Sequence, residues 1–311
     1  MIGAGSFGRH HLRVVSKSPG AELAGVIDID ESKAAAARAE YNCPVFTSIA
    51  ELPGQVDAAI VAVPTSAHGE IGCALLENGI DVLVEKPIAA DVDTARRLVN
   101  TAERRGRVLQ VGHLERFNPA VAELKKIVRL PLFFEIHRLS LFSPRSLDVD
   151  VVLDLMIHDL DIVLDLVGEA PEEIRAAGIT ILSDKVDIAN VRLAFPSGCI
   201  ANLTASRVST ERVRKLRLFQ PHQYISLDYQ KQEAVAFNVS GNQQIGFQPL
   251  AVAKDEPLKL EIEAFLDAVR TRNRPPASGE DGLRALEVAM AVLDKIEEHA
   301  KVVAQQIQSL P

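Results

Sequence analysis

Residues 3 to 8 read Gly-Ala-Gly-Ser-Phe-Gly, and this stretch decides the class of fold. It matches G-x-G-x-x-G, in which the first glycine allows a tight turn, the second lets a pyrophosphate approach the backbone, and the third allows close helix–strand packing. The helical pattern that follows, to about Ser18, would present its N-terminal N–H groups to the phosphates. The alternative is a purely structural turn. The residues predicted to hold a dinucleotide here are Gly3, Gly5, Ser6, Phe7 and Gly8.

Asp28 follows at the distance expected for a carboxylate that binds the ribose. It ends a predicted strand, Glu22–Asp28, and lies 20 residues after Gly8. Such a carboxylate accepts hydrogen bonds from the ribose hydroxyls and repels a 2′-phosphate. Because no arginine follows it immediately, the sequence favours NAD over NADP as the cofactor. The alternative is an aspartate that only caps the next helix.

The glycine-rich turn begins early in the chain, because only Met1 and Ile2 precede Gly3. A strand of ~5–6 residues normally opens such a domain. We therefore expect the first strand to be truncated, through a misplaced start codon or a trimmed chain, with a loss of stability. A truncated product without function is one possible consequence.

Short apolar runs alternate with helical patterns through the first half of the chain, which is typical of βαβ units and a parallel sheet. The clearest buried strands are Ala58–Val63 and Asp81–Glu85, with Val108–Val111 beyond them. Helices are predicted near Glu31–Glu40, Ser66–Asn78 and Asp91–Arg105. These elements predict an α/β fold that opens with a doubly wound Rossmann domain over residues 1–117.

From about Pro131 the chain changes to segments that alternate apolar and polar residues, which is typical of antiparallel strands with one polar face. These segments are Leu132–Leu139, Val186–Phe195, Cys199–Ser206 and Lys215–Phe219. Helices are predicted at Val149–Val167, Leu258–Thr271 and Gly282–Val303, and a connecting helix at Asn118-Pro119. Residues 118–311 are thus predicted to form an α+β domain, whose last helices are candidates to pack back on the first domain.

The composition excludes several classes of protein. Apolar residues make up 47% of the chain and charged residues 24%, the balance of an ordinary soluble protein. No apolar run reaches the roughly 18 residues of a membrane span, and no signal-peptide pattern opens the chain, so a cytoplasmic location is expected. The isolated Cys43, Cys73 and Cys199 suggest neither disulfides nor zinc. The net charge of −8 argues against nucleic acid or an anionic membrane as a partner.

Five basic residues stand out against this acidic background: Arg207, Arg212, Arg214, Lys215 and Arg217. They form either the solvated face of one or two strands or a wall that faces a phosphorylated or carboxylated substrate.

Lys86 follows a buried strand at its carboxyl end, the edge where open α/β sheets bind their ligands. A lysine that is partly desolvated there is suited to proton relay. Pro87 restricts the lysine backbone and can adopt the cis form. The alternative is a solvent-facing loop lysine paired with Glu85.

Asp154 and His158 stand at i and i+4 in an apolar helical pattern, so they share one face. An aspartate beside a histidine can fix its tautomer and stabilise the protonated ring, as a general base requires. A satisfied core histidine is the alternative. Asp161 and Asp165 continue the stripe, but one helix face supplies few converging ligands, and no metal is predicted.

Further residues beside the cofactor are expected at the ends of two strands. They are Val63, Pro64, Thr65 and His68 after one strand, and Glu85 at the end of the next. His68 is equally suited to cap the helix that it begins.

Four separated motifs resemble the Gfo/Idh/MocA oxidoreductases (glucose–fructose oxidoreductase, inositol dehydrogenase and rhizopine-catabolism proteins) over nearly the full chain. They are GAGSFGRHH, VAVPTSAHGEIGCALLENGIDVLVEKP, VGHLERFNP and DLMIHDLD, in the family's order. The resemblance implies a Rossmann domain followed by a domain with a large open antiparallel sheet, used for oligomerisation. Because such a sheet needs its free face covered, we expect a homodimer or homotetramer.

The resemblance also implies roles for the site residues. His158 would accept the proton of a substrate hydroxyl as hydride leaves for the nicotinamide, Lys86 would polarise the same oxygen, and Asp154 would orient the pair. Residues 112–119 would pass beside the nicotinamide. The residues expected to contact substrate are His113, Arg116, Arg145 and Arg207.

Two stretches, GHLERFNPAV and SPRSLDVDVVLDLMIHDLDIVL, look like bacterial members assigned as UDP-N-acetylglucosamine 3-dehydrogenases, which are linked to the amination of lipid A sugars. Arg145 and the basic cluster Arg207–Arg217 would then serve the diphosphate of a nucleotide sugar. A free sugar or polyol, as in inositol dehydrogenase, is the alternative substrate. A non-catalytic regulator that binds dinucleotide is the alternative of another class, and the presence of Lys86 and His158 argues against it.

Overall fold

The computed structural model describes residues 1–142, 149–239 and 244–308, and the chain divides into two compact units. One unit comprises Met1–Phe117 and Asp255–Leu286, and the other comprises Asn118–Lys254 and Glu287–Pro311. The long helix α8 (Gly279–Gln308) contributes residues to both units. The functions predicted for the two domains stay predictions at this point.

A parallel sheet forms the centre of the first unit. Its strands β1 (Ala58–Val61), β2 (Asp81–Glu85) and β3 (Leu109–Gly112) lie in that order, and each neighbouring pair is parallel. Their residues are almost all buried, as in a sheet that is covered on both faces. Single bridges extend it, from Val26 to Val45 on one side and from Gln110 to Ser278 on the other. The predicted α/β class is confirmed.

Ile2 takes the place of the strand at the centre of this sheet. It forms parallel bridges with both Ile27 and Val61, and its N–H donates to the carbonyl of Ile60 at 2.8 Å. The sheet is therefore continuous across its centre. A cavity of about 400 Å³ lies beside this short segment. Apolar side chains line much of it, among them Leu12, Ile60, Ile262 and Phe265.

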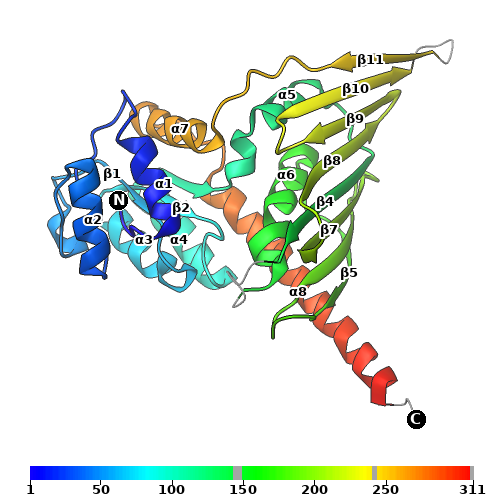
Figure 1. The fold of residues 1–311 in the computed structure, drawn as a ribbon, viewed down its shortest axis with the longest axis horizontal. Helices are drawn as coiled ribbons and strands as arrows, with labels where there is room; N and C mark the ends of the chain where they lie inside the picture. Colours follow the sequence, from blue (N-terminus) through cyan, green and yellow to red (C-terminus); the bar gives the residue numbers. More distant parts are fainter. Residues whose placement is uncertain (143–148, 240–243, 309–311) are drawn as a thin grey trace. The chain divides into compact units, whose positions relative to one another are not determined.

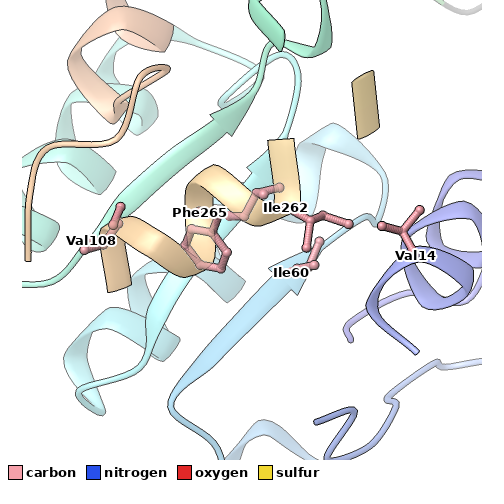
Figure 2. Packing of buried hydrophobic residues seen from close by; sticks show 7 residues of the cluster. Val14, Ile60, Val108, Ile262 and Phe265 are labelled. Carbon is pink, nitrogen blue, oxygen red and sulfur yellow. The ribbon is translucent and has the colours of Figure 1, made fainter. Parts of the chain in front are cut away.

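Helices cover both faces of the parallel sheet. On one face α1 (Ser6–Val15) and α7 (Pro257–Thr271) pack against the strands, and Figure 2 shows the apolar cluster that joins them. Its labelled members are Val14, Ile60, Val108, Ile262 and Phe265. On the other face α3 (His68–Glu77) and α4 (Val92–Arg105) pack so closely that a Cβ on Gly72 would lie 2.8 Å from Leu98. The helix α2 (Glu31–Tyr41) and short 3-10 turns at Ile49–Glu51, Thr65–Ala67 and Leu114–Phe117 complete the unit.

An eight-stranded sheet dominates the second unit (Figure 1), in the order β11-β10-β9-β8-β4-β7-β6-β5. The strands are β4 (Phe133–Leu141), β5 (Glu173–Ile179), β6 (Ile188–Ala194), β7 (Ile200–Ser209), β8 (Val213–Gln220), β9 (Gln223–Asp228), β10 (Glu233–Val239) and β11 (Ile245–Pro249). All neighbours are antiparallel except β4 and β7, which are parallel. The predicted large antiparallel sheet is confirmed, with the one parallel pair β4–β7 as an exception, because alternation along a strand does not reveal the direction of its partner.

The two faces of the large sheet differ in character. On one face the side chains of Phe134, Ile136 and Leu216 are fully buried. There α5 (Pro119–Ile127) contacts β9 and β10, and a π-helical turn, η4 (Val152–Met156), contacts β7 and leads into α6 (Ile157–Val167). The other face carries a row of five aromatic rings whose centroids lie 4.8–5.9 Å apart. We call it the aromatic row: Phe133, Phe219, Tyr224, Phe237 and Phe247.

Candidate active site

The glycine-rich turn leaves room for a ligand at Gly5 and none at its flanking glycines. Gly3 has a φ of +88°, and a Cβ there would lie 2.3 Å from the carbonyl oxygen of Ala62. A Cβ on Gly8 would lie 2.0 Å from the carbonyl oxygen of Gly3. A Cβ on Gly5 would meet no atom of the described residues within 4 Å. Gly3 and Gly8 therefore hold the turn, while Gly5 keeps open the approach to the first N–H groups of α1.

A cavity of about 280 Å³ adjoins this turn. It is lined by Ala4, Gly5, Ser6, Arg9, Ser32, Lys33, Ala36 and Ala37, from the turn and from the first half of α2. Helix α1 has no acidic residue in its first turn, so its positive dipole end is not neutralised there. The open space at Gly5 and the helix N-terminus fit the phosphates of a dinucleotide.

Asp28, on the segment that pairs with Ile2, accepts a hydrogen bond from the glycine-rich turn. Its Oδ2 accepts the N–H of Ala4 at 2.6 Å, and its Oδ1 accepts the N–H of Asp30 at 2.8 Å. Asp28 as a whole is half-buried. Helix capping belongs to Asp30, whose side chain accepts the N–H groups of Ser32 and Lys33. Asp28 thus orders the turn and is compatible with the predicted contact to a ribose.

His68 connects the loops that follow β1 and β2. Its ring is 1% exposed, and its nitrogens lie 2.9 Å from the carbonyl oxygen of Pro87 and 3.0 Å from that of Val63. Burial lowers the pKa of this imidazole, although the two carbonyls raise it in part. Val63, Pro64 and Thr65 form the first of these loops. His68 therefore orders both loops at the carboxyl edge of the sheet.

Lys86 stands at that same edge, directly after β2, and its bond to Pro87 is cis. The lysine is half-buried. The N–H of Lys86 donates to Oε2 of Glu85 at 3.2 Å, so the preceding glutamate holds the lysine backbone. The other carboxylate oxygen of Glu85 lies 2.6 Å from Nε2 of His11, on α1. The partner of Glu85 is thus a histidine far away in sequence.

The segment after β3 holds two residues predicted to contact substrate. His113 is buried, 1% exposed, and Arg116 is 8% exposed. The guanidinium of Arg116 donates to the carbonyl of Pro276 at 2.9 Å and lies 3.4 Å from a carboxylate oxygen of Asp281. Arg116 therefore ties this segment to the start of α8, and its predicted contact with substrate stays a prediction.

Asp154 and His158 lie in the second unit, on consecutive turns of one helical segment. Asp154 belongs to the π-helical turn and His158 to the first turn of α6, and both are half-buried. The sequence predicted one continuous α-helix here, because the wider π turn leaves the apolar periodicity almost unchanged. π-helical turns occur frequently at functional sites.

A buried ion pair fixes this helix next to His158. Nε and Nη2 of Arg138, on β4, donate to the two oxygens of Asp159 at 2.7 and 2.8 Å. The guanidinium also lies 5.1 Å from the ring centroid of Tyr229. Sequence reasoning missed this pair, although the inward position of Arg138 on a predicted strand was a signal that it needs a buried partner.

The remaining acids of the helical stripe do not gather as metal ligands. Asp165 pairs with Lys125 at 2.6 Å, and Asp161 is 1% exposed. Within residues 1–142, 149–239 and 244–308, no three His, Cys, Asp or Glu side chains cluster as a metal site. In the same ranges no helix is long and apolar enough to cross a membrane.

The basic cluster of the sequence is divided between two faces. Arg207 is 5% exposed and donates to Asp187 at 2.8 Å, to Ser183 at 2.9 Å and to the carbonyl of Val149. Lys215 and Arg217 point instead to the open face of β8. Arg212 is exposed and Arg214 is partly buried. Arg207 thus joins β7 to the chain before η4, while Arg145 lies outside the described residues.

Comparison with known proteins gives one consistent result. Residues 1–113 match the family model described as "Oxidoreductase family, NAD-binding Rossmann fold", and residues 138–221 match "GFO/IDH/MocA C-terminal domain". A UDP-N-acetylglucosamine 3-dehydrogenase of Acidithiobacillus ferrooxidans is 36% identical over 96% of both chains, and its solved structure superposes with a TM-score of 0.91. An inositol 2-dehydrogenase of Rhizobium meliloti is 26% identical over 97% of both chains. The chain therefore belongs to the Gfo/Idh/MocA family of NAD(P)-binding oxidoreductases, dehydrogenases that act on sugar hydroxyls.

Proposed function

We propose that this dehydrogenase oxidises a nucleotide sugar, UDP-N-acetylglucosamine, with NAD as the acceptor. The observation that carries the proposal is the likeness of 36% over 96% of the chain to a relative named for that activity. The likeness to the inositol 2-dehydrogenase is lower, at 26%. A free sugar or inositol is the second candidate, because that likeness also extends over 97% of both chains.

The residues of the glycine-rich turn would hold the cofactor. Gly5 and Ser6 would receive the pyrophosphate, and Asp28 would accept hydrogen bonds from the ribose hydroxyls, which favours NAD over NADP. Val63, Pro64, Thr65, Glu85 and Lys86 would lie toward the nicotinamide. When bound, the cofactor accepts a hydride at C4 of its nicotinamide ring.

Three side chains would take part in removing the proton of the substrate hydroxyl. His158 accepts it as the C–H electron pair leaves with the hydride, so the alcohol becomes a carbonyl and the imidazole becomes an imidazolium. Lys86 donates a hydrogen bond to the same oxygen, and Asp154 orients the histidine. General-base assistance of this kind typically contributes ~10²–10⁴-fold to the rate. The presence of all three groups argues against a non-catalytic regulator.

The setting of the reaction is part of the proposal. The three cysteines are free thiols, as expected for the reducing cytoplasm that holds the nicotinamide pool. Oxidation of UDP-N-acetylglucosamine would place the protein in the supply of lipid A sugars. The exposed aromatic row supports a homodimer or homotetramer, because an open sheet face of this kind is normally covered.

The test is reduction of NAD, followed at the absorbance band of reduced nicotinamide, with UDP-N-acetylglucosamine or myo-inositol as the sugar. We expect reduction with the nucleotide sugar and its loss in Lys86→Ala and His158→Gln. Lys301→Ala, an exposed lysine on α8, is the matched control and should act as wild type. If NAD were reduced with myo-inositol and not with UDP-N-acetylglucosamine, inositol would become the proposed substrate. Binding of NAD without reduction of any sugar would favour the regulator.

A further inference from the structure

His11 and Glu85 are in contact beside the backbone of Lys86, and a third titratable side chain, Glu261, interacts electrostatically with Glu85. His11 comes from α1, Glu85 from the end of β2 and Glu261 from α7. His11 and Glu261 are each 1% exposed, and the side chain of Glu85 is 16% exposed. Buried charges are costly unless they are paired, so a cluster of this kind needs an explanation. The mechanism proposed above uses Lys86 and gives these three side chains no part in the transfer of the hydroxyl proton.

Glu85 is clamped between α1, the Lys86 backbone and β3. Its Oε1 lies 2.6 Å from Nε2 of His11, and its Oε2 accepts the N–H of Lys86 at 3.2 Å. A Cβ on Gly112, its register partner on β3, would lie 3.0 Å from Oε2 and 3.2 Å from Cδ. Because an ionised carboxylate only accepts hydrogen bonds, Nε2 of His11 must donate. The position of Glu85 thus sets the position of the Lys86 backbone.

Glu261 supplies a second carboxyl group, near enough to Glu85 for its pKa to respond to the charge of Glu85. Its Oε1 has no hydrogen-bond partner among the residues that the structure describes, and its backbone carbonyl is held by Nε2 of Gln110 at 3.0 Å. Burial raises the pKa of Glu261 well above its ordinary value, and the charge of Glu85 raises it further. The pKa of Glu85 is lowered: burial opposes this, but the hydrogen bond and charge of His11 and the charge of Lys86 outweigh it.

We propose that His11, Glu85 and Glu261 form a positioning cluster for Lys86, in which Glu261 is protonated and Glu85 is ionised at neutral pH. The proposal rests on the catalytic role proposed for Lys86. A neutral acid at Glu261 lets the cluster carry one carboxylate charge, on Glu85, which the hydrogen bond from His11 and the charge of Lys86 stabilise. Loss of the Glu261 proton would place a second negative charge beside Glu85 and displace it, together with the backbone of Lys86.

The groups that face Glu85 come from each element around it. They are His11 on α1, Lys86 next in the chain, Glu261 on α7 and His68 at the start of α3, whose pKa the charge of Glu85 raises in part. A pH effect of Glu261 must therefore be separated from that of His68. The variant Glu261→Gln does so, because it keeps the size of the neutral acid and removes its titration.

The first test does not depend on activity. Infrared difference spectroscopy at neutral pH should show the carbonyl-stretching band of a protonated carboxylic acid in the wild type, and Glu261→Gln should lose it. Glu263→Gln, an exposed glutamate on the same helix, is the matched control and should keep the band. A wild-type spectrum without the band, or a band that survives in Glu261→Gln, overturns the proposal even if the sugar dehydrogenase activity stands.

The second test separates positioning from folding. Glu85→Gln should lower kcat by up to about 100-fold, as expected for a small misplacement of a reacting group, while the circular dichroism spectrum of the folded chain stays unchanged. Glu261→Gln should keep the wild-type kcat at neutral pH. As the pH rises, its kcat should fall less than that of the wild type, because the decrease caused by ionisation of Glu261 is missing. Equal kcat in Glu85→Gln and wild type, or an unchanged alkaline profile in Glu261→Gln, would contradict the positioning role. If no sugar reacted, the proposed function would be contradicted. The infrared test of the proton on Glu261 would still hold, because it does not depend on activity.

Discussion

Gly5 and Gly8, in the glycine-rich turn, have opposite surroundings. A substitution at Gly8 should therefore change mainly the stability of the fold, and one at Gly5 mainly the binding of NAD. A Cβ at Gly8 would be 2.0 Å from a backbone oxygen, whereas a Cβ at Gly5 would enter open space among the described residues. We expect Gly8→Ala to cost about 1–3 kcal/mol of the free energy of unfolding, as overpacking does. Gly5→Ala should cost about 1 kcal/mol or less, the difference between these residues as N-caps, but weaken NAD binding at least ~10-fold, or ~1.4 kcal/mol. Thermal melting and titration calorimetry check the pair. A Gly5→Ala variant that binds NAD with the affinity of the wild type would contradict the proposal that the pyrophosphate lies at Gly5.

Glu261 also makes the stability of the fold depend on pH in a predictable direction. Its pKa is raised on folding, so the folded state holds the proton over a pH range in which the unfolded state has lost it. The contribution to stability is therefore full below the ordinary glutamate pKa of about 4.3 and falls as the pH rises above it. Urea unfolding at several pH values should show a smaller decline above this point in Glu261→Gln than in wild type. Equal slopes would show that another group causes the decline.

At the scale of elements, the Arg138–Asp159 pair joins β4 to the helix that carries His158. Removing one partner leaves a buried charge without compensation, so Arg138→Met should cost roughly 3–5 kcal/mol. The double variant Arg138→Met with Asp159→Leu should recover much of that loss. The exposed pair Arg175–Glu173 is the matched control, and its removal should cost under ~1 kcal/mol. Urea unfolding measures all four chains. A loss in Arg138→Met as small as in the control would contradict the structural role of the pair.

The sequence predicted elements well where burial leaves a periodic signal. The bounds of β2 and the approximate places of β1, β3, α4 and α7 follow from apolar runs and caps. The edge strand β11 has five exposed residues, so it carries no alternation to detect, and β5 is only partly buried. Local pattern also located Lys86 and the glycine turn. The pairs His11–Glu85 and Arg138–Asp159 were missed, because nothing local identifies a partner that lies 74 or 21 residues away in sequence.

At the scale of the whole molecule, we expect the association between copies proposed above to use the aromatic row, which is partly exposed. Phe247 is 65% exposed and Ile245 is 73% exposed, on the edge strand β11. We expect Phe247→Asp to lower the mass seen by sedimentation equilibrium without changing the circular dichroism spectrum. Ile29→Asp, an exposed apolar residue of the first unit, is the control and should keep the wild-type mass. An unchanged mass in Phe247→Asp would exclude this part of the row from the interface.

The parallel pairing of β4 with β7 has a consequence for the order in which the second unit folds during synthesis. Both neighbours of β4 in the sheet, β7 and β8, begin only at Ile200 or later, while β4 ends at Leu141. At ~5–20 residues per second, the ribosome needs roughly 3–12 s to make the intervening chain. Throughout that interval Phe134 and Ile136 belong to a strand with two open edges. The nascent chain therefore passes through a stage in which a holding chaperone has a defined apolar strand to bind, and aggregation competes with completion of the sheet.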